Sequence, residues 1–338
     1  MTIPASFTDI SIDELRKEGV DDVRVMGMLR KMLEIRRFEE KVEELYLVKG
    51  QLMGPSHLYI GQEAIAVGIL SACASNDLVI SNYRGHGHAI ARDVPMKYLM
   101  AELYGRADGT CKGLGGSMHS AIHPAKGMIF ASAIVASGVP IAVGLALASK
   151  QQKKDDVIVV FFGDGGLNTG AFHEGANLAS IWNLPVIFVC ENNQYAMGTS
   201  TAATTASANL VDRGAVYDIP SKKIDGNDVG SVFVTAKDAL ARARKGDGPS
   251  FLLCQTYRSK GHGVYDRSEY KPVGEADGWI DRDPIVRLRK VIMENDIATD
   301  ADISAMEADI AANIANAVEF AQKSPYLDFE ELSKYVYA

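Results

Sequence analysis

The sequence predicts an α/β fold in which a parallel sheet is flanked by helices. Two features indicate it: short, uninterrupted apolar runs suited to strands buried on both faces, and helical stretches that alternate with these runs. The chain has 338 residues, of which 47% are hydrophobic and 23% charged, values typical of a globular protein with a sizeable core. It contains no internal repeat and no low-complexity linker.

The N-terminal part is predicted to be helical. Ser11 and Glu14 fit a capping box, in which each side chain satisfies a backbone N–H of the other residue. Apolar residues then recur at helical spacing from Val25 to Leu45, which predicts a long amphipathic helix ending near Gly50. The apolar stripe is long enough to be buried either within this chain or against another subunit. We take residues 1–50 as an N-terminal helical arm.

The stretch from Gly54 to Phe130 is rich in Gly and His, a composition typical of binding loops. Within it, residues 78–80 are expected to form a short strand and residues 96–104 a helix. A helix of small residues should follow from Ser137 to Lys150, with proline near its start, where the first turn tolerates it.

The middle of the chain contains a β-α-β unit followed by a further helix and strand. The predicted strands are 157–162, 185–190 and 249–256, and the predicted helices are 170–182 and 229–245, with a helical tail from residue 284 onward. We expect residues 51–270 to form the binding domain and residues 271–338 to be a C-terminal helical segment of the same domain.

Charge and cysteine content argue against several classes of protein. A net charge of -8 without long Lys or Arg runs disfavours nucleic acid or an anionic membrane as the main partner. The N-terminus lacks a signal-peptide pattern and no apolar stretch is long enough to cross a bilayer, which predicts a cytoplasmic protein. The four cysteines are widely spread without a C-x-x-C, so we expect reduced thiols, with Cys190 and Cys254 in buried strands, rather than a zinc or dithiol centre.

Polar residues follow both strands of the β-α-β unit. Parallel strands place their carboxyl ends at one edge of a sheet, so Asp164 and Asn193 should face the same small volume. Carboxylate and amide oxygens suit Mg²⁺, an ion that recruits phosphate oxygens. Gly165 and Gly166 would let a diphosphate approach the backbone at the start of the next helix. The sequence therefore predicts a Mg²⁺-bridged diphosphate.

Three other interpretations of these residues are possible. The dinucleotide fingerprint G-x-G-x-x-G begins at Gly163 but has Asn168 in place of its last glycine, although Glu191 could mimic its ribose-binding acid. A Walker A loop is excluded because the sequence contains no Gly-Lys pair. The simplest alternative is that Asp164 and Asn193 only cap turns after buried strands.

A G-D-G followed one β-α-β step later by N-N is typical of thiamin-diphosphate enzymes, and here it stands at residues 163–165 and 192–193. With "HLYIGQEAIAVG", "NYRGHGHAIA", "CKGLGGSMH", "ENNQYAMGTS" and "QTYRSKGHG", the chain resembles the α subunit of the two-chain E1 components of pyruvate, branched-chain and acetoin dehydrogenases. The resemblance runs from about residue 20 to about residue 325 and implies a thiamin-diphosphate-binding fold of the diphosphate type.

The resemblance implies a role for each matching residue. Asp164, the side chain of Asn193 and the main-chain carbonyl of Tyr195 would bind Mg²⁺, and Gly165 and Gly166 would cradle the diphosphate. The remaining implied residues are Tyr83 and Arg84 at the diphosphate, Ala133 and Val135 at the aminopyrimidine ring, Arg258 and His262 on a later loop close to the reactive carbon, and His57 as a second active-site histidine.

Three departures distinguish this chain within the family. Many pyruvate enzymes have glycine where Ala133 stands, and some have a regulatory serine where this chain has Gly263, so phosphorylation there is excluded. Lys260 and the run "VYDRSEY" also differ from the usual pyruvate pattern, whereas "CKGLGGSMH" and "AKGM" are more similar to acetoin dehydrogenases. These differences favour acetoin as the substrate.

The resemblance also implies partners. The glutamate that activates the cofactor belongs to a β subunit in this family, so an α2β2 heterotetramer with an active site between chains is expected. The complex would cleave acetoin or a 2-oxo acid such as pyruvate and pass the acetyl or acyl group to a lipoyl-bearing E2. A split transketolase-like enzyme or non-oxidative decarboxylase with the same cofactor is the alternative, and a cofactor-free interaction subunit is a third possibility that the intact Asp164 and Asn193 disfavour.

Three of the remaining histidines are interpreted as structural. His86, His88 and His173 are expected to be satisfied polar residues. His119 and His123 have the i, i+4 spacing of a metal pair, but nearby glycines and a proline disfavour a helix that would hold zinc there.

Overall fold

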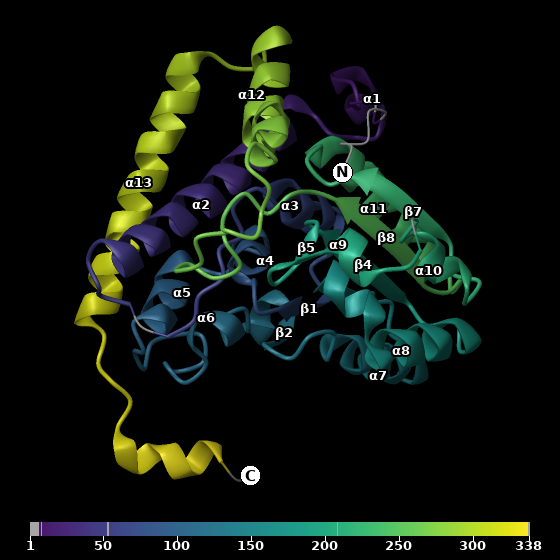
Figure 1. Ribbon diagram of the computed structural model, residues 1–338, viewed down its shortest axis with the longest axis horizontal. Helices are drawn as coiled ribbons and strands as arrows, with labels where there is room; N and C mark the ends of the chain where they lie inside the picture. Colours follow the sequence, from purple (N-terminus) through teal and green to yellow (C-terminus); the bar gives the residue numbers. More distant parts are fainter. Residues whose placement is uncertain (1–6, 8, 53, 208, 337–338) are drawn as a thin grey trace.

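A central parallel sheet with helices on both faces organises the molecule (Figure 1). The computed structural model describes residues 7, 9–52, 54–207 and 209–336. The sheet has six strands in the order β2-β1-β3-β4-β8-β7, and every neighbouring pair is parallel. Its strands are β1 Leu78–Asn82, β2 Met128–Ser132, β3 Ile158–Gly163, β4 Val186–Asn192, β7 Ser221–Asp225 and β8 Ser250–Gln255. The predicted α/β fold is confirmed.

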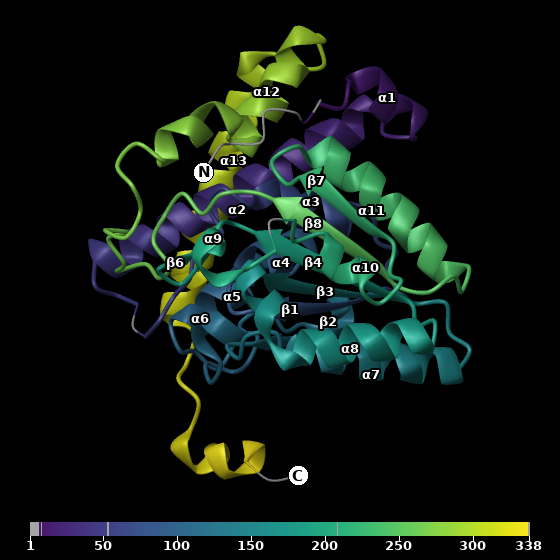
Figure 2. The same ribbon diagram turned by 45° about the vertical axis from the view of Figure 1, so that its right-hand side comes forward.

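Alternate residues of the central strands enter two different cores. Val159 and Phe161 of β3 pack with one group of helices, whereas Val160 and Phe162 pack with another, as the two-residue period of a strand requires. One face is covered by α7 Gly138–Gln151 and α8 Gly170–Ile181 (Figure 2). The other face is covered by α2 Asp22–Leu47, α3 Glu63–Ala72, α4 His86–Ala91 and α11 Val229–Arg244.

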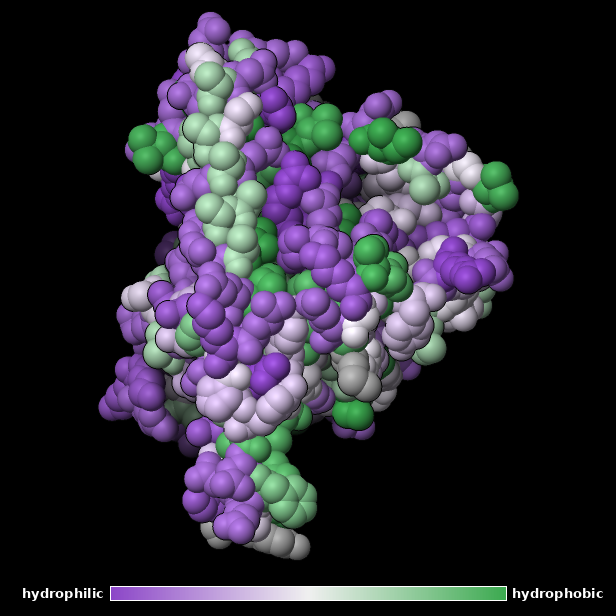
Figure 3. Space-filling model, turned by 90° about the vertical axis from the view of Figure 1, so that its left-hand side faces the viewer, coloured by the Kyte–Doolittle hydropathy of each residue, from purple (hydrophilic) through white to green (hydrophobic). Residues whose placement is uncertain are grey.

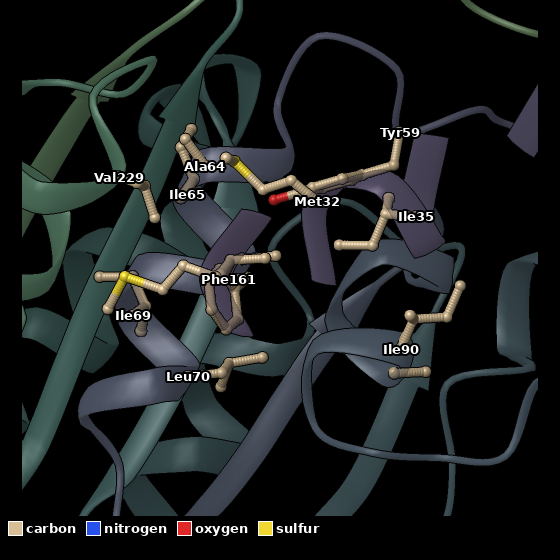
Figure 4. Packing of buried hydrophobic residues seen from close by; sticks show 14 of the residues in the cluster. Met32, Ile35, Tyr59, Ala64, Ile65, Ile69, Leu70, Ile90, Phe161 and Val229 are labelled. Carbon is tan, nitrogen blue, oxygen red and sulfur yellow. The ribbon is translucent and has the colours of Figure 1, made fainter. Parts of the chain in front are cut away.

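The N-terminal part contains two helices where the sequence predicted one long helix after the capping box. The box at Ser11 and Glu14 is confirmed, but it begins the short helix α1 Ile12–Lys17. Gly19, with φ of 82°, turns the chain before a new N-cap at Asp21 begins α2. The apolar stripe of α2 is buried within this chain: Figure 4 shows Met32 and Ile35 beside Tyr59 and Phe161.

Residues 54–130 are more regular than the predicted binding loops. They contain α3, α4, β1, β2, α5 Met96–Leu103 and α6 Gly116–His119. Two strands of the six-stranded sheet, β2 and β7, were not predicted, and both lie at its edges. Both edge strands are partly exposed. β7 contains two lysines and lacks the continuous apolar run by which β3, β4 and β8 could be recognised, whereas β2 has a short apolar run at residues 128–131, at the end of the Gly- and His-rich stretch that was expected to form loops.

The predicted helical tail is confirmed as α12 Pro284–Glu294 and α13 Asp300–Lys323, which pack beside α2. Beyond α13, a segment ending in the 3₁₀ turn Phe329–Tyr335 stands away from the body in Figures 1 and 3. The short elements are β5 Tyr195–Ala196, β6 Thr199–Ser200, α9 Thr201–Thr204, α10 Asp212–Ala215 and the 3₁₀ turns Pro124–Lys126, Asp164–Asn168 and Ala276–Arg282.

Two further expectations concern cysteines and membranes. All four cysteines are free thiols, and Cys190 and Cys254 are buried in strands as predicted. In the part of the chain that the structure describes, no helix combines the length and the apolar character needed to cross a membrane.

Close packing of α3 on α11 depends on a glycine. A Cβ at Gly68 would lie 2.6 Å from Val232 Cγ1 and 2.9 Å from the carbonyl oxygen of Val229. Gly68→Ala is therefore expected to lower the free energy of unfolding by about 1–3 kcal/mol. Gly27 of α2 is the matched control because a Cβ there meets open space, so Gly27→Ala should raise it by about 0.5–1 kcal/mol. Urea unfolding checks both, and similar values for the two variants would contradict the packing argument.

Candidate active site

The two predicted polar clusters meet at one edge of the sheet. β3 and β4 are neighbours, and Gly163 pairs with Glu191 at the ends of the two strands. Asp164 follows β3 directly and Asn193 follows β4 directly. Because both strands run in the same direction, their side chains come together at the carboxyl edge.

A cavity of about 250 Å³ opens at this edge. Seven of the residues implied by the family resemblance lie in its walls: Tyr83, Val135, Asp164, Gly165, Gly166, Asn193 and Tyr195. The other implied residues, His57, Arg84, Ala133, Arg258 and His262, are not among the described residues that line it. The rim is apolar and open, because Ile134, Val135 and Met197 are 70%, 50% and 66% exposed.

Asp164 is a buried carboxylate that fits a cation. It is only 3% exposed, and its Oδ2 accepts a hydrogen bond of 2.9 Å from the Thr201 hydroxyl. Burial raises the pKa of this carboxyl group above its ordinary value. No salt bridge between described residues involves Asp164. An ionised carboxylate buried without a paired charge is costly, so a bound cation would relieve a real cost here.

Asn193 and Tyr195 add two further oxygen donors. The Asn193 amide donates from Nδ2 to Oε1 of Gln62 at 3.2 Å, which orients its oxygen away from Gln62 and toward the Tyr195 N–H, 3.3 Å away. Among the described residues, no group of three or more His, Cys, Asp or Glu side chains is placed to hold a metal. A metal at this edge would therefore depend on one carboxylate, one amide and one main-chain carbonyl, which is the donor chemistry of a hard cation with few protein ligands.

The two glycines are required by the chain's own packing. A Cβ at Gly165 would lie 2.8 Å from the Cβ of Ala196, and one at Gly166 would lie 3.2 Å from the Phe162 ring. Without side chains, the backbone of the turn Asp164–Asn168 stays accessible from the cavity, which both glycines line. This is the geometry that a phosphate-binding turn needs.

His57, Tyr83 and His262 form an aromatic cluster. The ring of His57 lies 4.7 Å from that of Tyr83 and 4.7 Å from that of His262. Burial and the neighbouring Arg84 lower the pKa of His57 to about 3 and that of His262 to about 4. Both imidazoles are therefore neutral near pH 7, and Nδ1 of His57 has no hydrogen-bond partner. The structure thus brings together two histidines that lie far apart in the sequence.

Both implied arginines are engaged with the protein itself. Arg84 donates to the carbonyl oxygens of Leu58 at 2.5 Å and His262 at 3.2 Å. Arg258 donates to the carbonyl oxygens of Tyr195 at 3.1 Å and Met197 at 2.6 Å. The two guanidinium groups therefore fasten the histidine loop and the Tyr195 turn, and direct contact with a diphosphate stays a prediction.

Glu191 is bound in a way that disfavours the dinucleotide interpretation. Its carboxylate is buried and accepts hydrogen bonds from the Tyr59 hydroxyl, from His88 Nε2 at 3.0 Å and from Asn82 Nδ2 at 3.2 Å. Burial alone would raise its pKa, but contact with His88 lowers it below the ordinary value. The oxygens of its carboxylate thus already accept hydrogen bonds from protein side chains, whereas an acid that binds a ribose needs them free for the ribose hydroxyl groups.

The histidines interpreted as structural have protein partners. His86 bonds Glu39 and Ser117, His88 bonds Ser81 and Glu191, and His173 bonds the Tyr217 hydroxyl at 2.7 Å. His119 bonds the carbonyl oxygen of Ala131, and α6 ends at His119, so no helix carries it and His123 on one face.

Sequence reasoning did not identify Gln62, Thr201 and Glu39. Gln62 and Thr201 contact the implied metal ligands Asn193 and Asp164. Glu39 could have been identified from the sequence, since it is a charged residue inside the apolar stripe of α2. In the structure it is fully buried.

Acid should destabilise the protein partly through His57. Its pKa of about 3 in the folded chain lies below the ordinary value of 6.5, so the unfolded chain binds more protons between these two values. Stability should therefore fall as the pH drops through that window. His57→Asn should reduce this dependence by at most about 1.4 kcal/mol per pH unit. Urea unfolding of both proteins at neutral and mildly acidic pH checks it, and parallel curves would contradict it.

Comparison with known proteins identifies the family of this chain. The family model described as "Dehydrogenase E1 component" matches residues 30–330. The α subunit of the acetoin:2,6-dichlorophenolindophenol oxidoreductase of Bacillus subtilis is 42% identical over 327 residues, covering 96% of this chain and 97% of that protein. The pyruvate dehydrogenase E1 component subunit alpha of Rickettsia conorii is 40% identical, covering 90% and 93%. The chloroplastic pyruvate dehydrogenase E1 component subunit alpha-3 of rice is 38% identical, covering 90% and 73%. This chain belongs to the dehydrogenase E1 component family.

Proposed function

We propose that this chain is the α subunit of a thiamin-diphosphate-dependent E1 oxidoreductase that cleaves acetoin or a 2-oxo acid and transfers the acetyl or acyl group to a lipoyl-bearing E2. The observation that supports it most directly is the buried Asp164 carboxylate, which has no salt bridge among the described residues and lines one cavity with Asn193 and Tyr195 at the edge of the sheet. Membership in the E1 family supports the cofactor.

In this proposal, Asp164, Asn193 and the Tyr195 carbonyl hold Mg²⁺, and the backbone at Gly165 and Gly166 receives the diphosphate. Residues 51–270 would form the cofactor-binding domain, supported by the helices of residues 1–50 and 271–338. Ala133 and Val135 would contact the aminopyrimidine ring, and Tyr83 and Arg84 would stabilise the diphosphate end.

The cofactor, when bound, supplies a thiazolium carbon that adds to a carbonyl and holds the electrons left by cleavage. The chain's own contribution would come from His57 and His262. With pKa values of about 3 and about 4, both are neutral near pH 7 and can accept a proton or donate a hydrogen bond to a substrate oxygen. Tyr83 lies against His57 and limits its movement.

A β subunit is proposed as the partner, in an α2β2 heterotetramer. The exposed apolar rim of Ile134, Val135 and Met197 supports it, because such a rim beside a cavity is typical of a surface that another chain covers. The relatives are also named as α subunits. A cytoplasmic location stays a prediction, since the rice relative is named as chloroplastic.

Acetoin is the proposed substrate, with pyruvate next. The relative with 42% identity is named for acetoin, and Ala133 and Gly263 depart from the common pyruvate pattern. Relatives named for pyruvate are nearly as similar, at 40% and 38% identity.

Co-expression with a β subunit tests the proposal. The assembled complex should bind thiamin diphosphate in a Mg²⁺-dependent way that neither chain alone matches, and should reduce a lipoyl domain or an artificial acceptor with acetoin, pyruvate or a branched 2-oxo acid. Turnover without any acceptor, or ketol transfer between sugars, would instead support the split transketolase-like or decarboxylase alternative. Equal cofactor binding by the isolated chain would contradict the two-chain site.

A further inference from the structure

The backbone segment that carries His57 is held by hydrogen bonds on both sides of the histidine. Its Nδ1 has no partner, and the residues on both sides of it carry the hydrogen bonds that fix the segment. The carbonyl oxygen of Ser56 accepts from the N–H of Val264 at 2.9 Å, and the carbonyl oxygen of Leu58 accepts from Arg84 at 2.5 Å. The orientation of His57 therefore depends on how residues 56–59 are anchored.

Glu39 anchors this segment from both ends. Its side chain is 0% exposed and lies on α2 beneath the segment. Oε1 accepts from the N–H of Tyr59 at 2.9 Å, which is two residues after His57. Oε2 accepts from Nδ1 of His86 at 3.0 Å.

The second oxygen reaches the other side of His57 through a buried chain of side chains. His86 Nε2 lies 3.0 Å from the Ser117 hydroxyl, which lies 3.0 Å from the Ser56 hydroxyl. A carboxylate only accepts hydrogen bonds, so a neutral His86 donates from Nδ1 and accepts from Ser117 at Nε2. In that tautomer, Ser117 in turn accepts from Ser56, so the three side-chain hydrogen bonds run in one direction toward Glu39. One carboxylate thus fixes Tyr59 directly and Ser56 through two residues.

We propose that Glu39 is a positioning residue that sets the orientation of His57, and through Ser56 and Val264 the place of the His262 loop. The inference rests on the proposed function, because it assumes that the His57 side chain takes part in the proposed reaction. His57 and His262, with rings 4.7 Å apart, are the side chains that this anchoring serves.

Stability alone gives a weaker account of Glu39. Burying a carboxylate in an apolar helix stripe costs free energy, and an apolar residue of similar size is often as stable or more stable at such a position. Ile35, Phe38 and Val42 of the same stripe are apolar and fully buried. A carboxylate among them is accounted for by the two directed hydrogen bonds that it makes.

Glu39→Gln is the informative variant. Glutamine can still accept from Tyr59, but its amide must donate to His86, which forces the imidazole proton to Nε2 and reverses the bond to Ser117. Glu34→Gln is the matched control, since Glu34 lies on the same helix, is also buried and bonds Arg30 and Lys31 instead of the segment. Both variants remove one buried charge from α2.

Two measurements on the αβ complex test the positioning role of Glu39. Turnover by Glu39→Gln should fall at least about tenfold while KM for the substrate and affinity for the cofactor change less than about threefold. In the cofactor-free complex, exchange of the imidazole C2 hydrogen, followed by mass spectrometry, should be faster at His57 and unchanged at His173. Glu34→Gln should match wild type in both.

Ser117→Ala provides an independent check because it removes the hydroxyl link without altering the charge of Glu39. It should reproduce part of the loss in turnover. The double variant with Glu39→Gln should lose less turnover than the two single losses combined, because the two residues belong to one series of hydrogen bonds. Unchanged His57 exchange in Glu39→Gln, or equal effects of Glu34→Gln, would overturn the inference. A wild-type complex without thiamin-dependent turnover would instead overturn the proposed function, and the exchange measurement would still report on Glu39.

Discussion

Asp164→Ala should weaken binding of thiamin diphosphate to the αβ complex by at least about 100-fold in the presence of Mg²⁺, equivalent to about 2.7 kcal/mol. The carboxylate is the only charged member of the proposed ligand set of Asp164, Asn193 and the Tyr195 carbonyl. In the absence of cofactor the same substitution should not destabilise the protein through charge, because burial raises the pKa of Asp164 and makes its ionised form costly. The variant should therefore lose the thermal stabilisation that Mg²⁺ and cofactor give to wild type.

Isothermal titration calorimetry with thiamin diphosphate, with and without Mg²⁺, measures this loss. Asp156→Ala is the matched control, since Asp156 is also buried but lies just before β3, at the opposite end of that strand, and accepts from the Ser149 hydroxyl of α7. That control should lose stability and keep its affinity for the cofactor. Equal affinities of wild type and Asp164→Ala would remove the metal assignment.

His262→Ala should lower turnover by about 100-fold while the affinity for thiamin diphosphate changes less than about threefold. The reason lies in how the loop is anchored. Arg84 holds the main-chain carbonyl of His262 at 3.2 Å, and Asp266 accepts from its main-chain N–H at 2.6 Å. These bonds involve the backbone, so they survive in alanine, and the loss is confined to the imidazole.

Acyl transfer to an isolated lipoyl domain and calorimetry with the cofactor separate the two effects. His173→Ala is the control, because His173 bonds the Tyr217 hydroxyl on α8's side of the sheet and lines no part of the cavity among the residues described. It should leave both quantities near wild type. If acyl transfer by His262→Ala equalled that of wild type, the proposed role of the imidazole would be wrong.

The sequence predicted the parts of the structure that are determined locally. β3, β4 and β8 were recognised because strands buried on both faces are continuously apolar, and the position of Asp164 beside Asn193 followed from one β-α-β unit. The edge strand β7 was missed because its exposed lysines interrupt that pattern, and β2 was missed because its short apolar run ends a stretch whose Gly and His content indicated loops. The long N-terminal helix was predicted as one because the turn at Gly19 lies within an otherwise helical composition.

Side-chain partners that lie far apart in the chain could not be predicted. The Arg84 side chain is directed to carbonyl oxygens of Leu58 and His262, and nothing in the local sequence around Arg84 specifies the second. Glu39 could have been noticed as a charge in an apolar stripe, but its partners Tyr59 and His86 come from other elements. Such contacts depend on tertiary packing, which residue spacing does not encode.

The order of the strands also determines when each part of the active site exists during synthesis. β3 and β4 are consecutive in the chain and adjacent in the sheet, so the turn at Asp164 and the loop at Asn193 can meet soon after both leave the ribosome. His57 is made long before them, but the loop with its neighbour His262 follows β8 and comes much later. The phosphate end of the site is therefore local in the chain and complete early, whereas the histidine end is long-range and complete late. A chain that stops between residues 255 and 262 contains all six strands of the sheet but lacks the second imidazole.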